Sequence, residues 1–190
     1  ERVALNFLQR LSGIATATRA MVDRAGKAAV FDTRKTTPGL RTLERYAVAV
    51  GGGRNHRFGL FDQVLLKENH FELSGLGMAA TIERAKSRVR PGVVVGAEAR
   101  DDEEADAALA AGADYVLLDN FPADKLRATV TRLRAKAKEL RRALEIEASG
   151  GIDASNVAAY GATGVDRISS GALTHSARAL DLALDVEPIR

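Results

Sequence analysis

The chain has 190 residues, of which 46% are hydrophobic, and this is enough to bury the core of one domain. Its 28 basic and 25 acidic residues leave a net charge of +3, and only 5% of the residues are aromatic, so nucleic acid is not an indicated partner. The absence of Cys excludes disulfides and thiolate chemistry and fits a cytoplasmic protein, and no apolar run is long enough to predict a membrane span.

The first predicted element is an amphipathic helix over residues 2 to about 23, where apolar residues recur at helical spacing: Leu5, Leu8, Leu11 and Ile14. The apolar run at residues 28–31 then predicts a strand, which ends in a loop that carries Thr33, Arg34 and Lys35.

A second helix is predicted over residues 40–50, with one apolar face made of Leu43, Tyr46, Ala47 and Val50. Three glycines at positions 51–53 end this helix, and the polar sequence Arg54-Asn55-His56-Arg57 follows directly. Two loops rich in cations therefore flank one helix, as is typical of a site that binds an anion.

Five more apolar runs predict strands, at residues 64–66, 93–97, 115–118, 144–148 and 165–169. Helical segments separate them, at residues 76–89, after the acidic residues 101–104, from residue 123 to about 142, and after an Asp153 N-cap. Regular alternation of strand and helix predicts an α/β fold with parallel strands, either a closed barrel or an open doubly wound sheet.

Polar residues or glycines stand where each predicted strand ends, and in a parallel barrel these positions converge on one rim. They are Thr33-Arg34-Lys35, Lys67, Glu98, Asp119, Ser149-Gly150-Gly151 and Ser170-Gly171-Ala172. An anionic substrate beside Arg34, Arg57 and Lys67, a phosphate on the two glycine turns, and a divalent cation near Glu98 and Asp119 would satisfy all of these groups. Two anions and a metal ion suggest group transfer.

Structural interpretations remain open for each of these features. The Gly-Gly sequence is also typical of a tight turn into a helix, and Glu98 and Asp119 could form ion pairs with Arg34 or Lys67. His56 and His175 fit orienting or capping roles better than metal ligation, because no second His lies at a ligand spacing.

Several motifs along nearly the whole chain are familiar: Asp32-Thr33-Arg34-Lys35-Thr36, Gly51-Gly52-Gly53 with Asn55-His56-Arg57, Lys67 with Asn69-His70, Leu117-Leu118-Asp119-Asn120, Ser149-Gly150-Gly151, and Gly171-Ala172-Leu173-Thr174-His175-Ser176. With them the sequence resembles the quinolinate phosphoribosyltransferases, the carboxylating nicotinate-nucleotide pyrophosphorylases of NAD biosynthesis. The resemblance implies a barrel of the type II phosphoribosyltransferase kind, incomplete with six or seven strands. It would form one domain over residues 1–190, with residues 1–24 as a helix leading into it.

The implied reaction joins quinolinate to phosphoribosyl pyrophosphate with Mg²⁺ and releases nicotinate mononucleotide, pyrophosphate and CO₂. By the same resemblance, Thr33, Arg34, His56, Arg57 and Lys67 would surround quinolinate. Lys35, Glu98, Asp119 and the turns Ser149–Gly151 and Ser170–Ala172 would hold phosphoribosyl pyrophosphate, with Glu98 and Asp119 at the metal and Lys67, Glu98 and Asp119 as the catalytic group. Arg2 would reach the site of a neighbouring subunit in a homodimer or higher homo-oligomer.

The sequence departs from the family pattern in two respects. Members normally carry an N-terminal α/β domain of roughly a hundred residues, whose absence here predicts an open, less active site, and Gly96 stands where a Glu is common. A related transferase acting on another aromatic carboxylate, or a non-catalytic barrel that binds phosphate ligands, remain the alternatives.

Overall fold

One parallel sheet organises the protein. The computed structural model describes residues 1–187, and the remaining three lie outside this description. The described residues form six strands: β1 (Ala29–Phe31), β2 (Val64–Leu66), β3 (Val95–Ala99), β4 (Tyr115–Asp119), β5 (Glu145–Ser149) and β6 (Arg167–Ser169). All hydrogen-bonded strand pairs are parallel, so the carboxyl ends of the strands lie on the same side of the sheet.

The strand order identifies the fold as a barrel that is open on one side. The order is β1-β6-β5-β4-β3-β2, so the first strand pairs with the last and every other neighbour is consecutive in sequence. A doubly wound sheet would instead reverse direction at a switch point. The parallel α/β barrel with six strands is therefore confirmed, and its opening lies between β1 and β2.

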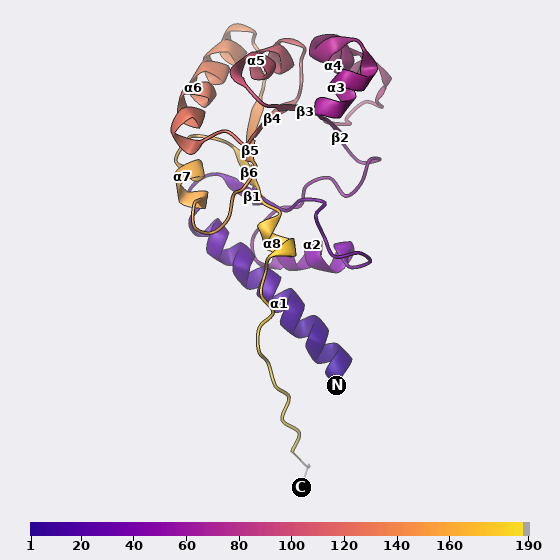
Figure 1. The fold of residues 1–190 in the computed structure, drawn as a ribbon, viewed down its shortest axis with the longest axis vertical. Coiled ribbons are helices and arrows are strands. Elements are labelled where there is room, and N and C mark those ends of the chain that lie inside the picture. Colours follow the sequence, from indigo (N-terminus) through magenta and orange to yellow (C-terminus); the bar gives the residue numbers. More distant parts are fainter. Residues whose placement is uncertain (188–190) are drawn as a thin grey trace.

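Helices cover the outer side of the curved sheet, as Figure 1 shows for α4, α5, α6 and α7. The helices are α1 (Arg2–Val22), α2 (Arg41–Val50), α3 (Glu68–Ser74), α4 (Gly77–Arg88), α5 (Asp102–Ala110), α6 (Ala123–Glu139), α7 (Val157–Gly161) and α8 (Ala172–His175). None of the helices in residues 1–187 combines the length and the apolar character that a membrane crossing needs.

Three local predictions were wrong. Helix α3 was not predicted, because its seven residues bury no side chain and so carry no apolar periodicity. Strand β3 begins two residues later than expected, which places Glu98 inside the strand. Asp153 does not cap the helix that follows it, because α7 begins at Val157 with Asn156 as its N-cap, while the Asp153 carboxylate accepts from Ser155.

Alternate residues of the strands face two different environments. On the outer face, Val116 and Leu118 of β4 belong to the main hydrophobic core beneath the helices. On the inner face, Tyr115 and Leu117 form a small separate cluster with Leu65. The inside of the barrel is thus largely left to polar side chains, some of which belong to the site described below.

Helix α2 turns a different face to the core than its apolar residues suggested. Glu44 is fully buried, whereas Leu43, Tyr46 and Val50 are 39%, 66% and 62% exposed. The buried Glu44 carboxylate accepts from Arg10 Nη2 at 3.0 Å and from the Thr37 hydroxyl at 2.8 Å. These bonds make a charged residue the inward-facing one, which apolar periodicity alone cannot reveal.

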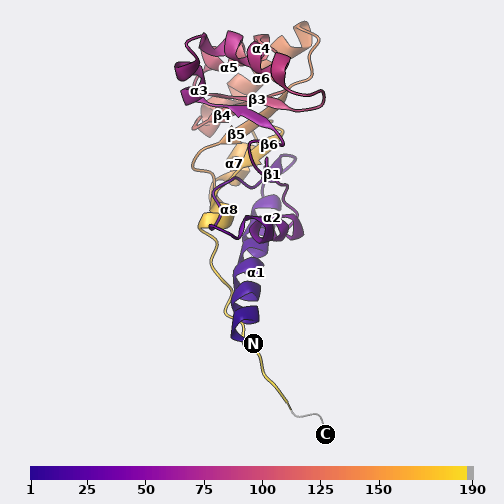
Figure 2. The same cartoon turned by 90° about the vertical axis from the view of Figure 1, so that its right-hand side faces the viewer.

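The C-terminal segment returns along α1. Figures 1 and 2 both show it running beside this helix, which extends away from the sheet. The Leu180 amide donates to Gln9 O at 3.0 Å, and Gln9 Nε2 donates to Leu182 O at 2.8 Å. A Cβ at Gly13 would lie 2.0 Å from Arg178 O, so this glycine permits the close crossing of the two segments.

Candidate functional site

The carboxyl ends of the strands surround a cavity of about 620 Å³. Nearly all residues predicted for the site line this cavity: Thr33, Arg34, Lys35, His56, Arg57, Lys67, Glu98, Asp119, Ser149, Gly150, Gly151, Ser170, Gly171 and Ala172. Arg2 does not, because it lies exposed at the start of α1, far along the helix from the sheet (Figure 1). Its expected contact with a neighbouring subunit stays a prediction.

Further lining residues were not predicted as ligand contacts. They are Leu65, Leu117, Asn120, Ile152, Asp153, Ser169, His175 and Ser176. The first two are apolar residues of the inner strand face, whose exposure to a cavity cannot be told from core burial by sequence. Asn120, His175 and Ser176 belong to the motifs named above and stand next to predicted residues, which was the available signal.

Cations without partners dominate one side of the cavity. The side chains of Arg34, Lys35 and Arg57 make no ion pair and donate no hydrogen bond to other groups within residues 1–187. Burial lowers the pKa of Arg57, and the nearby charge of Arg34 lowers it further. Two guanidinium groups close enough to repel each other, with no carboxylate of the described chain between them, make a site for an external anion.

Lys67 is paired rather than free. Its Nζ contacts Glu98 Oε2 across neighbouring strands β2 and β3. The Lys67 side chain is 43% exposed and that of Glu98 is 11% exposed, so the pair lies at the edge of the cavity. The structural interpretation considered for Glu98 therefore holds for the protein by itself, with Lys67 as its partner.

The loop after β4 fixes Asp119. Asn120 Nδ2 donates to Asp119 Oδ2 at 2.6 Å, and the Asn120 amide donates to Ser149 O at 2.9 Å. Asn120 has a positive φ of 57°, which asparagine tolerates. A Cβ on Gly150 would lie 2.2 Å from Asn120 Oδ1, so only glycine allows the two loops to meet here.

The two glycine turns face the cavity without forming helix N-termini. Gly150 and Gly151 have positive φ values of 97° and 60°, and the next helix begins six residues later, at Val157. In the second turn, Ser170 Oγ donates to Ile152 O at 2.5 Å and accepts from the Ala172 amide at 3.2 Å. A phosphate at these turns would meet backbone amides of the loops themselves.

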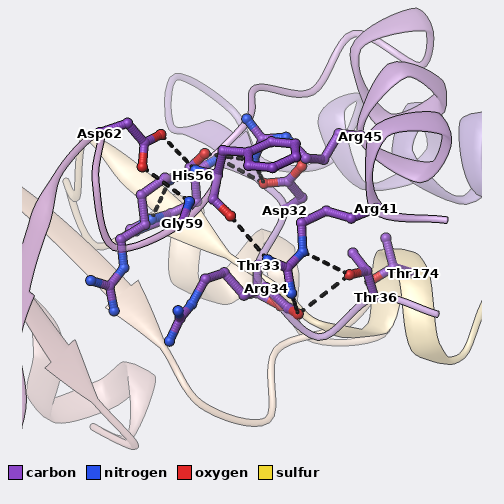
Figure 3. A network of polar contacts seen from close by, with 12 residues as sticks. Asp32, Thr33, Arg34, Thr36, Arg41, Arg45, His56, Gly59, Asp62 and Thr174 are labelled. Atoms are coloured by element: carbon purple, nitrogen blue, oxygen red, sulfur yellow. Dashed lines mark hydrogen bonds and ion pairs between the residues drawn. The ribbon is translucent and has the colours of Figure 1, made fainter. Parts of the chain in front are cut away.

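A buried carboxylate joins the loops that carry the cations. Asp32 is fully buried and accepts from the His56 amide at 2.7 Å, with Arg45 Nη1 3.6 Å away. In the amide orientation that satisfies both of its ends, Asn55 donates to Asp32 Oδ2 at 2.6 Å. Figure 3 shows Asp32 between Arg45 and His56, while the side chain of Arg34 extends away from this network.

The Asp32 carboxyl has an elevated pKa as a result. Burial raises it from 3.8 to about 6, and the hydrogen bond from the His56 amide and the charge of Arg45 only partly oppose that rise. Asp32 lies directly before Thr33 and Arg34 in sequence, so its contacts fix the start of the cationic loop.

The ring of Tyr115 occupies the space at Gly96. A Cβ on Gly96 would lie 2.1 Å from Tyr115 ring atoms, and Arg167 stacks on the same ring at 4.9 Å from its centroid. Burial raises the pKa of the Tyr115 hydroxyl. The expected glutamate could not fit beside this ring, which explains the glycine at position 96.

Comparison with known proteins identifies the family. The family model described as quinolinate phosphoribosyl transferase, C-terminal domain, matches residues 14–185. The chain belongs to this family.

Individual relatives agree with this assignment. The chain is similar to the nicotinate-nucleotide pyrophosphorylase (carboxylating) of Mycobacterium leprae, with 45% identity over 98% of this chain and 64% of that protein. It is 41% identical to the chloroplastic enzyme of the same name from Arabidopsis thaliana, over 98% of this chain and 57% of the relative. The structure of the nicotinate-nucleotide pyrophosphorylase from Francisella tularensis superposes with a TM-score of 0.88 at 43% identity.

The match covers only part of these relatives. The Francisella structure is matched over 96% of this chain but 63% of its own length. The present chain therefore corresponds to the phosphoribosyltransferase C-terminal domain, and the cavity described above lies wholly within the matched residues 14–185.

The elevated pKa of Asp32 leads to a prediction about stability. Between pH 3.8 and about 6 the folded protein keeps a proton on Asp32 that the unfolded chain has released, so the free energy of unfolding falls as the pH rises. Asp32→Asn removes this titration. We expect the wild type to lose up to about 3 kcal/mol relative to the variant across that window, measured by urea denaturation. A difference between the two proteins that is constant with pH would contradict this.

Proposed function

We propose that the site serves phosphoribosyl transfer to quinolinate in NAD biosynthesis, with nicotinate mononucleotide, pyrophosphate and CO₂ as products. The observation that carries this proposal is the set of unpaired cations, Arg34, Lys35 and Arg57, opposite two carboxylates and two glycine turns in one cavity. A dianionic aromatic acid and a polyphosphate ester together supply the anions that this arrangement lacks.

The cavity divides into two regions on this proposal. Thr33, Arg34, His56, Arg57 and Lys67 form the quinolinate region, near the loops after β1 and before β2. Lys35, Asp119 and the turns Ser149–Gly151 and Ser170–Ala172 form the region for phosphoribosyl pyrophosphate, with Glu98 between the two. Lys67 then contacts quinolinate through the ammonium group that now pairs with Glu98.

The fixed cations have a direct role in the chemistry. Transfer joins the pyridine nitrogen to C1 of the ribose as pyrophosphate leaves, and the adjacent carboxylate then departs as CO₂. Loss of CO₂ leaves negative charge on the ring carbon until a proton replaces it. Arg34 and Arg57, held close together in the partly buried region, stabilise that charge without reorganising.

Mg²⁺ fits this site as a shared ligand rather than as a caged ion. Residues 1–187 contain no cluster of three or more His, Cys, Asp or Glu side chains able to hold a metal. Mg²⁺ usually takes one or two carboxylates and completes its shell with water and substrate phosphates. Asp119 and Glu98 would supply the carboxylates, and the ion would neutralise charge on the pyrophosphate.

The assembly belongs to the same proposal. A cytoplasmic homodimer or higher homo-oligomer would bring Arg2 to the site of a neighbouring subunit. The exposed position of Arg2 at the start of α1 leaves its side chain available for such a contact.

Calorimetry with each ligand, combined with a turnover assay, tests the proposed function. We expect quinolinate and phosphoribosyl pyrophosphate both to bind, and the chain to form nicotinate mononucleotide and CO₂ when Mg²⁺ is present. Binding of phosphoribosyl pyrophosphate without quinolinate would instead favour a transferase for another acceptor. Binding of both without product would indicate a non-catalytic barrel.

Replacement of Arg57 tests the division of the cavity. Arg57→Ala should weaken quinolinate binding by about 2–4 kcal/mol, because a guanidinium matched to a carboxylate is lost from one region only. Binding of phosphoribosyl pyrophosphate should change little. Arg54→Ala is the matched control, since Arg54 lies on the same loop, is exposed and is not among the residues lining the cavity. Equal losses for both ligands would overturn the division.

Replacement of Asp119 tests the metal region. Asp119→Asn should raise the Mg²⁺ concentration needed for half-maximal turnover, because a neutral amide is a poorer ligand for a hard cation. Asp124→Asn, an exposed position in the first turn of α6, provides the control. A Mg²⁺ titration identical to that of the wild type would remove Asp119 from the metal site.

A further inference from the structure

Glu147 is a buried acid to which nothing above assigns a role. It lies in β5, two residues before the Ser149 that lines the cavity, and is fully buried. Neither carboxylate oxygen accepts a hydrogen bond of good geometry within residues 1–187. A buried carboxyl group without partners is costly, so a protein that keeps one usually has a use for it.

The nearest polar atom to this acid is on His56. Its Nε2 lies 3.2 Å from Glu147 Oε1, which is within ion-pair distance. The other ring nitrogen, Nδ1, accepts a hydrogen bond from the Arg57 amide at 2.9 Å. A nitrogen that accepts carries no proton, so the proton of a neutral His56 ring lies on Nε2, facing Glu147.

The other surroundings of His56 leave its ring to these two contacts. The rings of Phe31 in β1 and Tyr115 in β4 pack edge-on against it, with centroids 6.2 and 6.1 Å away. The charged groups Asp32 and Arg45 bind its backbone instead, through its amide and its carbonyl. The Glu147 charge also contributes to the raised pKa of the neighbouring Tyr115 hydroxyl.

We propose that Glu147 is a positioning residue that holds His56 in the Nε2-protonated tautomer, so that Nδ1 can accept from the Arg57 amide and set the direction of the Arg57 side chain. The chain of contacts runs from the inside of the barrel to the anion site: carboxylate, imidazole, backbone amide, guanidinium. His56 then acts on the anion through Arg57. Its ring is 7% exposed and both nitrogens are engaged.

The opposite tautomer would break this chain of contacts. A proton on Nδ1 would face the Arg57 N–H, donor against donor, and would push the start of the Arg57 residue away from the ring. Without an acceptor at Glu147, the Nε2 proton loses its partner and this tautomer loses its advantage. The identity of the side chain at position 147 thereby reaches a cavity residue that it does not contact.

Two replacements separate the acceptor from the volume. Glu147→Gln keeps an oxygen that accepts from Nε2–H, whereas Glu147→Met fills a similar volume with no comparable acceptor. An apolar replacement of similar volume is the variant of a buried charge that folds most readily. Glu145→Met is the matched control, on the same strand two residues away, because Glu145 is exposed and pairs with Arg167 instead.

Nitrogen NMR of the protein labelled at histidine reads the tautomer directly. The chain has three histidines, and His56→Asn assigns the signals. We expect Nε2-protonated His56 in the wild type, in Glu147→Gln and in Glu145→Met, and a mixture of tautomers in Glu147→Met. Nδ1-protonated His56 in the wild type, or an unchanged tautomer in Glu147→Met, would overturn the proposal. This measurement needs no ligand and does not depend on the proposed function.

Calorimetry with quinolinate then tests the consequence for the site, and this part rests on the proposed function. Glu147→Met should weaken quinolinate about tenfold, the scale for one lost hydrogen bond, and clearly more than Glu147→Gln does. Binding of phosphoribosyl pyrophosphate should stay within about twofold. Equal losses for both ligands would make Glu147 a general structural residue and overturn its assigned role. If the wild type binds no quinolinate, the proposed function fails while the tautomer result still stands.

Discussion

The buried carboxylate of Asp32 is the contact on which the site depends. It accepts from the His56 amide and, through Asn55, from the segment that bridges the open side of the barrel. The same residue leads directly into Thr33 and Arg34, so one carboxyl group fixes two loops that are more than twenty residues apart in sequence. That segment also borders the free edge of β1, where Arg54 and Phe31 form an isolated parallel bridge. The cations of the site are thus carried at the place where the sheet fails to close.

A barrel interior with polar side chains accounts for this arrangement. Tyr115, Glu147 and Arg167 occupy inner positions of β4, β5 and β6, where an ordinary small barrel would bury branched apolar residues. Each of them is costly to bury alone, and they share the cost by stacking and by electrostatic interaction: Arg167 lies over the rings of both Tyr115 and Phe31. The close fit of Tyr115 against Gly96 couples two positions on adjacent strands, so neither can change without the other.

The sequence was informative about the site because of a topological rule and uninformative where single contacts decide. Parallel strands end on one side, so Lys67, Asp119 and Gly171 could be placed around one cavity although they lie far apart in the chain. The same reasoning could not choose between a barrel and a doubly wound sheet, because only the pairing of β1 with β6 settles that. It also misjudged the buried face of α2, since hydrogen bonds to Arg10 and Thr37 allow Glu44 to point inward. Glu147 escaped notice for a related reason: an acid within a strand reads as an exposed position unless its partner across the barrel is known.

The electrostatics of the cavity connect binding to stability. Arg34 and Arg57 repel each other, and the burial of Arg57 adds to the cost of keeping its charge. The Asp32 network holds the loops that carry these charges, and therefore the fold works against the repulsion whenever no anion lies between them. An anion that binds only the folded protein relieves this cost, and its contribution to stability grows with its concentration above the dissociation constant. Asp32 enters the same balance from the other side: when it is protonated it no longer offsets the nearby cations, so an acidic solution both favours the buried carboxyl group and makes an external anion more strongly needed. The strain within the empty cavity and the affinity of the cavity for anions are therefore two consequences of one arrangement of charges.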